Sequence, residues 1–167
     1  RLSQLPQNLK GYDVVLFQEA FSSSRNAMLT QLAQEYPYQT HIPYGSGYNV
    51  FDSGVLVASR YPIVNTADFI YPNCTGTDCF ADKGVIYAEV IKGGKAYHVT
   101  STHTASFDTD EARALRQEHF QQIRALVNQQ NIPAFEAVMM GGDFNVNKFL
   151  WPQDYAQMLV NLNGTDP

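Results

Sequence analysis

Short apolar runs alternate along the chain with segments in which apolar residues recur at every third or fourth position. Runs of roughly four to eight residues rich in β-branched and aromatic side chains are typical of buried strands. Such runs predict strands at 12–18, 54–59, 84–91, 96–102 and 137–140. The third and fourth are joined only by Lys-Gly-Gly-Lys, which predicts a β-hairpin.

Two segments show helical periodicity. The first, 26–35, has apolar residues on one side, follows three serines that offer N-caps, and precedes Pro37. The second begins at Asp108 or Thr109 and runs to about Gln130 with a one-sided apolar stripe. We therefore expect one short and one long amphipathic helix.

The mixture of a hairpin with intervening helices indicates an α/β protein whose sheets contain antiparallel pairs. The stretches 43–51 and 68–83 are predicted to be loops. No repeat or linker divides the 167 residues, and 44% of them are hydrophobic. We therefore expect one globular domain, or most of one, with a sizeable core.

Charge and hydropathy argue against two classes of partner. The chain has 11 Lys and Arg against 16 Asp and Glu, a net charge of −5. Because nucleic-acid binding relies on many cations to neutralise phosphates, no nucleic-acid partner is expected. No stretch approaches the roughly 18 consecutive apolar residues of a membrane span, so no transmembrane segment is predicted.

The two cysteines, Cys74 and Cys79, lie close together in a Gly- and Thr-containing loop. A zinc site is not expected, because no third Cys or His lies at ligand spacing. The favoured interpretation is a local disulfide, and the alternative is two free thiols. A disulfide would imply that the protein is secreted to an oxidising compartment.

Polar side chains directly follow three of the predicted strands. Glu19 follows the first, His103 follows the fourth, and Asp143 and Asn145 follow the last in Gly141–Lys148. Singly, each has an ordinary explanation: a capping or salt-bridged Glu, a structural His, or a polar turn that closes a core strand. Together they end strands that can share one edge of a sheet, which indicates an active site.

These residue types suit the chemistry of phosphate esters. Mg²⁺ takes oxygen ligands and keeps several waters, so one or two carboxylates and a carboxamide can hold it against a phosphate. We expect Asp143 to orient or deprotonate the attacking water, and Asn145 to bind the phosphate or the metal-bound water. His103 is expected to donate a hydrogen bond to the phosphoryl oxygens.

Several short motifs resemble those of the endonuclease/exonuclease/phosphatase superfamily in the same order along the chain. They are Gln18-Glu19, Ser53-Gly54-Val55 through Ser59–Ile63, Thr102-His103-Thr104 and Gly142–Asn145. Within that superfamily, Asp82-Lys83-Gly84-Val85 and the extended Gly141–Lys148 are similar to the secreted neutral sphingomyelinases. The resemblance covers nearly the whole chain.

The resemblance implies an α/β/β/α four-layer sandwich with mixed sheets and Mg²⁺-dependent hydrolysis of sphingomyelin to ceramide and phosphocholine. The protein would contact the sphingomyelin-containing membrane peripherally. By this resemblance Glu19 ligates the metal, Asp143 and Asn145 position water and phosphate, and His103 contacts the phosphate. Lys83 would bind the substrate headgroup or stabilise the structure of the site. A lysine in such a loop is more commonly exposed to solvent.

Two parts of the family pattern are missing. The family begins with a strand that carries a metal-binding Asn and ends with an Asp-His pair whose His is the general base. We therefore expect residues 1–167 to be a single partial domain, incomplete at both ends and inactive alone. The alternatives are a nuclease or inositol-polyphosphate phosphatase of the same superfamily, and a catalytically dead module that binds lipid or protein.

The apolar cluster Phe149-Leu150-Trp151 lies beside the proposed site in the sequence. Packing in the core is the favoured interpretation of this cluster. The alternative is an exposed cluster that inserts at a lipid interface.

Overall fold

The computed structural model describes residues 5–21, 25–45 and 49–166, and the serines that were predicted to cap the first helix lie outside these ranges. The elements, in chain order, are α1 (Leu5–Asn8), β1 (Val14–Phe17), α2 (Arg25–Leu32), β2 (Tyr38–Gln39), β3 (Leu56–Ser59), β4 (Ile63–Ile70), the 3₁₀ helix η2 (Gly76–Phe80), β5 (Gly84–Lys92), β6 (Lys95–His103), α3 (Asp110–Asn128), β7 (Ala137–Asp143) and α4 (Pro152–Leu162).

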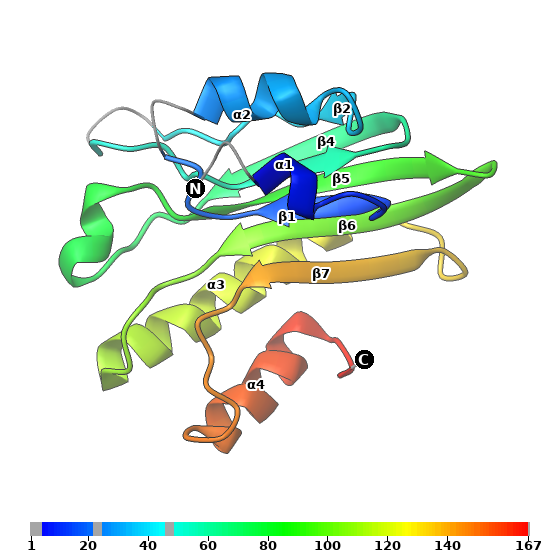
Figure 1. The fold of residues 1–167 in the computed structure, drawn as a ribbon. Helices are drawn as coiled ribbons and strands as arrows, with labels where there is room; N and C mark the ends of the chain where they lie inside the picture. Colours follow the sequence, from blue (N-terminus) through cyan, green and yellow to red (C-terminus); the bar gives the residue numbers. More distant parts are fainter. Residues whose placement is uncertain (1–4, 22–24, 46–48, 167) are drawn as a thin grey trace.

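The strands form two sheets that lie face to face (Figure 1). The smaller sheet has the order β1-β3-β2, and both of its pairs are antiparallel. The larger sheet has the order β4-β5-β6-β7, in which only the β6–β7 pair is parallel. The long helix α3 connects β6 to β7, as a parallel crossover requires.

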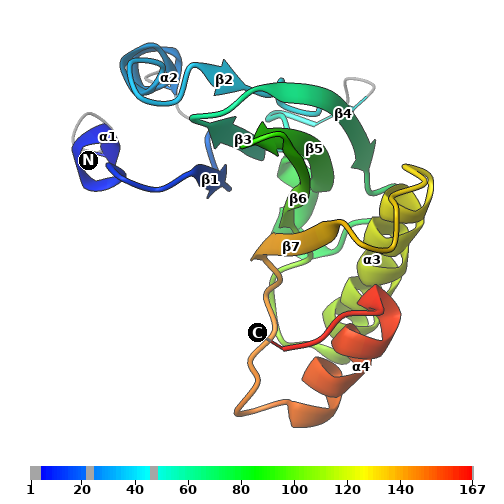
Figure 2. The same ribbon diagram turned by 90° about the vertical axis from the view of Figure 1, so that its right-hand side faces the viewer.

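Helices cover the outer face of each sheet, so the molecule has four layers in the order α/β/β/α (Figure 2). Three apolar cores lie between successive layers. Leu32 and Tyr36 pack beneath the smaller sheet, Val57 and Ile86 meet between the sheets, and Phe120 belongs to the core under α3 and α4. The predicted four-layer sandwich is therefore confirmed.

The hairpin predicted between β5 and β6 is present. Its turn residues Gly93 and Gly94 have φ values of 60° and 75°, which favour glycine, and Lys92 pairs with Lys95 across the turn. The predicted long helix is also confirmed: α3 begins after Thr109, whose side chain accepts a hydrogen bond from the Ala112 N–H at 3.2 Å.

The last predicted strand is present as β7, but the prediction that it is buried is wrong. Val138 is 37% exposed and Met139 is 51% exposed. Within the described residues β7 pairs only with β6, so it forms the outer strand of its sheet. An apolar run alone does not reveal whether a neighbouring strand covers it.

The elements missing from the predictions include β2, β4, η2 and α4. The strand β4 extends into the start of the loop predicted at 68–83, and its exposed, polar positions hide the strand pattern. The helix α4 has a signal that could have been used, since Pro152 occupies its first turn and Tyr155, Met158 and Leu162 recur at helical spacing on the core side.

The predicted disulfide is present, with Cys74 and Cys79 closing a loop that contains most of η2. The structure describes no helix that combines the length and the apolar character needed to cross a membrane.

Candidate active site

Three strands bring the predicted site residues to one edge of the sandwich. In the larger sheet, His103 at the end of β6 pairs with Asp143 at the end of β7. β1 crosses beneath them from the smaller sheet, where the Ser101 hydroxyl donates to the Phe17 carbonyl at 3.0 Å. Glu19 follows β1 closely and has an exposed side chain. The ends of β1, β6 and β7 therefore converge (Figure 1).

Two glycines permit this convergence. A Cβ atom on Gly142 would lie 2.2 Å from the Thr102 carbonyl oxygen, and the φ of Gly142 is 136°. A Cβ on Gly141 would lie 2.6 Å from Cδ1 of Leu16 in the facing sheet. The Gly-Gly pair before Asp143 thus fits β7 against both β6 and β1, which places the carboxylate at the strand ends.

The residues after β7 form a structured polar turn. The Asn145 N–H donates to Asp143 Oδ1 at 3.0 Å, and the Asn145 side-chain amide donates to the Thr104 carbonyl at 3.1 Å. Asn145 has a φ of 50°, a left-handed conformation that Asn tolerates well. The polar-turn and active-site interpretations are therefore compatible: the turn fixes Asn145, while the Asp143 side chain stays 51% exposed.

Lys83 and His103 form a buried pair beside Asp143. The Lys83 Nζ lies 2.9 Å from His103 Nε2, and His103 Nε2 lies 4.0 Å from Asp143 Oδ2. The side chains of Lys83 and His103 are 6% and 4% exposed. The expectation that Lys83 is commonly an exposed loop residue is wrong for this chain. A protonated lysine only donates, so Nε2 accepts and the proton of a neutral His103 lies on Nδ1.

The ammonium group of Lys83 is saturated by protein acceptors. Besides His103, it donates to the Thr104 carbonyl at 3.1 Å and to the Ser106 hydroxyl at 3.0 Å. An ammonium group has three protons, so these three contacts use all of them. This arrangement is the one expected of a residue that braces the site.

Asp78 is a member of this cluster that the sequence prediction missed. It lies in η2 within the disulfide loop, its Oδ1 is 3.4 Å from Lys83 Nζ, and its Oδ2 accepts from the Ser106 N–H at 2.6 Å. Nothing in the local sequence distinguishes Asp78 from a solvated loop residue. The Cys74–Cys79 bridge was the available signal that this loop has a fixed structure.

Burial and neighbouring charges shift the pKa values of the pair. Burial lowers the pKa of Lys83, while the carboxylates of Asp78, Asp143 and Glu19 act in the opposite direction. Burial, followed by the charge of Lys83, lowers the pKa of His103. The site therefore favours a neutral His103, and Glu19 lies near enough to act electrostatically on both groups.

Asp82, the residue before Lys83, connects a second loop to the site. Its carboxylate accepts hydrogen bonds from the Gly45 N–H at 2.7 Å and from the Asn49 side chain at 2.6 Å. The Asp-Lys-Gly motif thus has two roles: Asp82 anchors the loop that precedes β3, and Lys83 reaches His103. Gly84 is required for packing, because a Cβ there would lie 2.6 Å from the Phe69 carbonyl oxygen.

An open groove of about 610 Å³ is lined by Asp143 and Asn145 together with Phe107 and Phe149. Phe149 is 93% exposed and Leu150 is 67% exposed. The prediction that this apolar cluster packs in the core is therefore wrong for these two residues. The lining of the groove therefore combines polar groups at the strand ends with exposed apolar side chains.

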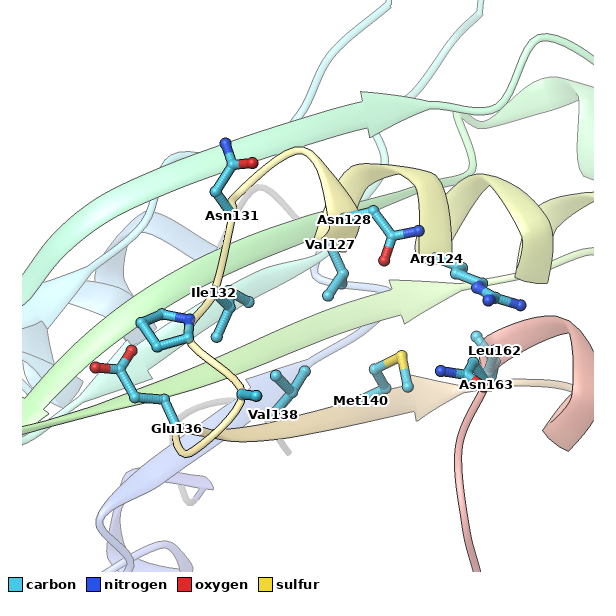
Figure 3. Close-up of a pocket in the computed structure, with 12 residues that line it drawn as sticks. Arg124, Val127, Asn128, Asn131, Ile132, Glu136, Val138, Met140, Leu162 and Asn163 are labelled. Atoms are coloured by element: carbon cyan, nitrogen blue, oxygen red, sulfur yellow. The ribbon is translucent and has the colours of Figure 1, made fainter.

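A second cavity of about 330 Å³ lies between the end of α3, the start of β7 and the end of α4 (Figure 3). Arg124, Asn128, Glu136 and Asn163 contribute polar atoms to its lining. Glu136 is paired with His98 at 2.8 Å. None of the predicted site residues lines this cavity, so it is separate from the groove at the strand ends.

The donor set at the strand ends suits a hard cation with few protein ligands. Among residues 5–21, 25–45 and 49–166, no three His, Cys, Asp or Glu side chains cluster closely enough to enclose a metal ion. Mg²⁺ is commonly held by one or two carboxylates together with waters and substrate phosphate. The single exposed carboxylate of Glu19 fits that kind of magnesium site. It does not fit a structural zinc site, which takes four protein ligands.

Comparisons with known proteins agree with the fold and with the resemblance seen in the motifs. The chain is 35% identical to sphingomyelinase C of Listeria ivanovii and 35% identical to a phospholipase C of Staphylococcus aureus, over 95% of this chain in each case. The structure matches a crystal structure of Staphylococcus aureus beta toxin with bound magnesium ions at a TM-score of 0.92 and 34% identity, covering 99% of this chain and 63% of that one.

The chain spans about half the length of the two relatives, namely 52% of each. Residues 1–163 match the Endonuclease/Exonuclease/phosphatase family. The resemblance inferred from the motifs is confirmed by these comparisons, and the chain belongs to the endonuclease/exonuclease/phosphatase family.

Proposed function

We propose that the whole protein is a Mg²⁺-dependent phosphodiesterase that hydrolyses sphingomyelin to ceramide and phosphocholine. The observation that carries this proposal is the convergence of Glu19, His103, Asp143 and Asn145 at one sheet edge around the buried Lys83. The similarity to sphingomyelinase C of Listeria ivanovii supports the choice of substrate.

Asp143 and Asn145 act on the water and the phosphate. Asp143 has an exposed carboxylate with Oδ2 directed to within 4.0 Å of His103, so it orients or deprotonates the attacking water. Asn145 is held by the Thr104 carbonyl and by its own turn, so its position is fixed before a phosphate binds. Such preorganisation lowers the reorganisation needed in the transition state.

His103 and Lys83 lie beneath the place where the substrate phosphate would bind. His103 Nε2 faces Asp143 and accepts from Lys83, so it donates to a phosphoryl oxygen there only when His103 is protonated and the contact with Lys83 is released. Lys83 supplies positive charge beneath the site and keeps the imidazole in place. For Lys83 to contact the headgroup, its ammonium group must first give up one of its three hydrogen bonds to the protein.

Glu19 is the residue of this chain that would hold Mg²⁺. When bound, Mg²⁺ polarises a phosphoryl oxygen and stabilises the negative charge that develops on the leaving group. The Gln18 side chain, one residue earlier, donates to the Ser101 hydroxyl at 3.0 Å, so the end of β1 is fixed against β6. This contact helps to keep the Glu19 carboxylate at the strand-end edge.

Secretion is part of the proposal. The Cys74–Cys79 bridge closes the loop that delivers Asp78 to the site, and disulfides persist in oxidising compartments. We infer that the protein acts outside the reducing cytosol.

The test is product release by the whole protein with Mg²⁺ from sphingomyelin vesicles. Release of phosphocholine, abolished by EDTA and by Asp143→Asn, supports the proposal. Cleavage of duplex DNA or of inositol polyphosphates without phosphocholine release would identify a sister activity instead. Vesicle binding without any hydrolysis would identify a binding module.

A further inference from the structure

The chain after β7 makes a tight turn whose tip is apolar. Asn147 Oδ1 accepts hydrogen bonds from the N–H groups of Phe149 and Leu150 at 3.1 and 3.0 Å, and the Trp151 N–H donates to the Asn147 carbonyl at 2.8 Å. The turn is therefore held by the side chain and the backbone of Asn147. It keeps Phe149 93% exposed and Leu150 67% exposed, although burial of such side chains is favourable.

The apolar tip is continuous with the candidate active site. One groove is lined by Asp143 and Asn145 together with Phe149 and Phe107, and Phe107 is itself 49% exposed. Its volume of about 610 Å³ is within the roughly 300–1,000 Å³ typical of small-molecule sites. A groove lined by both polar groups and apolar side chains matches a phosphodiester attached to hydrocarbon.

We propose that Phe149 and Leu150 insert into the surface of a zwitterionic phospholipid bilayer and hold the groove over a lipid headgroup. This inference rests on the proposed function, because it assumes that the phosphate in the groove belongs to a membrane lipid. Large apolar side chains at an exposed tip enter the boundary between headgroups and acyl chains and gain the free energy of burial there.

The charge of the chain favours a zwitterionic bilayer over an anionic one. The net charge is −5, and Asp108 lines the groove next to Phe107. The lysine that lines the groove, Lys148, is paired with Asp166 and lies 4.6 Å from the centroid of the Tyr155 ring. Attraction to anionic headgroups is therefore weak, and we expect binding to depend on apolar insertion and to change little with ionic strength.

The chain provides a reporter and a matched control. Trp151 is the only tryptophan of residues 1–167 and directly follows Leu150, so the part of the whole protein's fluorescence that Trp151→Phe removes reports on the tip. Phe135 is 88% exposed, as strongly as Phe149, but it lies before β7 at the opposite end of that strand. Phe135→Ser therefore removes a similarly exposed aromatic ring without touching the groove.

The experiment measures binding to phosphatidylcholine vesicles that contain no sphingomyelin, so that turnover does not contribute. Vesicle sedimentation gives the affinity, and quenching of Trp151 by lipids brominated along their acyl chains reports insertion. The double variant Phe149→Ser/Leu150→Ser should bind at least roughly tenfold more weakly and lose the quenching, while Phe135→Ser binds as the wild type does. Unchanged thermal unfolding of both variants establishes that each is folded.

Equal binding by the wild type and the double variant would overturn the inference, and so would absence of wild-type binding. Self-association that the double variant loses, seen without vesicle binding, would assign the tip to contact with a second copy and would also overturn it. Failure of the proposed function gives a different result: vesicle binding still depends on Phe149 and Leu150, but sphingomyelin releases no phosphocholine.

Discussion

Lys83 Nζ lies 2.9 Å from His103 Nε2, and both side chains are buried beneath the exposed carboxylate of Asp143. The contact joins the residue that precedes β5 to the last residue of β6, so the antiparallel pairing of these strands sets its geometry. A buried ammonium group needs anionic or polar partners, and Lys83 has Asp78, Thr104 and Ser106 in addition to His103.

Replacement of Lys83 by Met should impair catalysis more than folding. The variant keeps the apolar stem but removes the positive charge and the donor to His103, and loss of one preorganised donor costs roughly 10²–10³ in kcat. Steady-state hydrolysis of sphingomyelin by the whole protein measures the effect. Lys95→Met, at the exposed tip of the hairpin, is the control and should retain wild-type kcat. Equal activity of the two variants would contradict the role given to Lys83.

Asp78→Asn should move the alkaline limb of the pH profile. The Asp78 carboxylate favours the charged form of Lys83 and opposes the effect of burial on its pKa. Without that charge the pKa of Lys83 falls further, so the lysine loses its proton, and the enzyme its activity, at a lower pH. The profile of kcat/KM against pH measures this shift.

Asp110→Asn is the control for Asp78→Asn, because the Asp110 side chain is 98% exposed on the first turn of α3. Its profile should overlay that of the wild type. An unshifted profile for Asp78→Asn would show that the charge of Asp78 does not act on the titrating group.

His119 should make the folded state sensitive to mild acid. Its ring stacks on Tyr71 with centroids 3.9 Å apart, its Nδ1 accepts from the Ala105 N–H at 3.3 Å, and burial lowers its pKa from 6.5 to about 4. The unfolded chain therefore takes up the proton first. The stability due to a neutral His119 is fully present above about pH 6.5 and is lost as the pH falls towards 4, by about 3 kcal/mol in total.

Denaturant unfolding between pH 7 and pH 4 measures this loss. His119→Phe keeps a ring on Tyr71 and should flatten the dependence of the unfolding free energy on pH, even if the variant is less stable throughout. The same slope in His119→Phe as in the wild type would exclude His119 as its source.

Gly142→Ala should destabilise the end of β7. The new Cβ would lie 2.2 Å from the Thr102 carbonyl oxygen, and the φ of 136° is strained for alanine, so we expect a loss of about 2–4 kcal/mol. Gly164→Ala, where the added Cβ meets nothing closer than 3.5 Å, is the control. Thermal unfolding compares the two. If both alanines cost the same, the close approach of β7 to β6 is not required for stability.

The sequence predicted the elements whose signals are local. The hairpin turn needed glycines with positive φ, and α3 had a one-sided stripe and a Thr cap, so both could be recognised within a short window. The strand-end residues Glu19, His103 and Asp143 were found because each directly follows an apolar run. Their convergence depends on the pairing of β6 with β7, which the sequence indicated only as strands that can share one edge of a sheet.

The failures involve information that no short window contains. Burial of β7 depends on whether another strand pairs with its outer edge. Burial of Lys83 depends on the disulfide-closed loop, which brings Asp78 against it. Asp78 lies near Lys83 because of the structure of the Cys74–Cys79 loop, which no short window of sequence reveals. Phe149 was predicted to be buried because it is apolar, but Asn147 fixes a turn that directs it outwards.

The central claim is that the strand-end edge is a Mg²⁺-dependent phosphodiesterase site to which this chain contributes Glu19. The most direct test titrates Mg²⁺ into metal-free whole protein and measures phosphocholine release from sphingomyelin for the wild type and for Glu19→Gln. We predict that the wild type is inactive without the metal and saturates with it, while Glu19→Gln needs at least roughly tenfold more Mg²⁺ or stays inactive. Hydrolysis that is independent of Mg²⁺, or an identical Mg²⁺ dependence in Glu19→Gln, would contradict it.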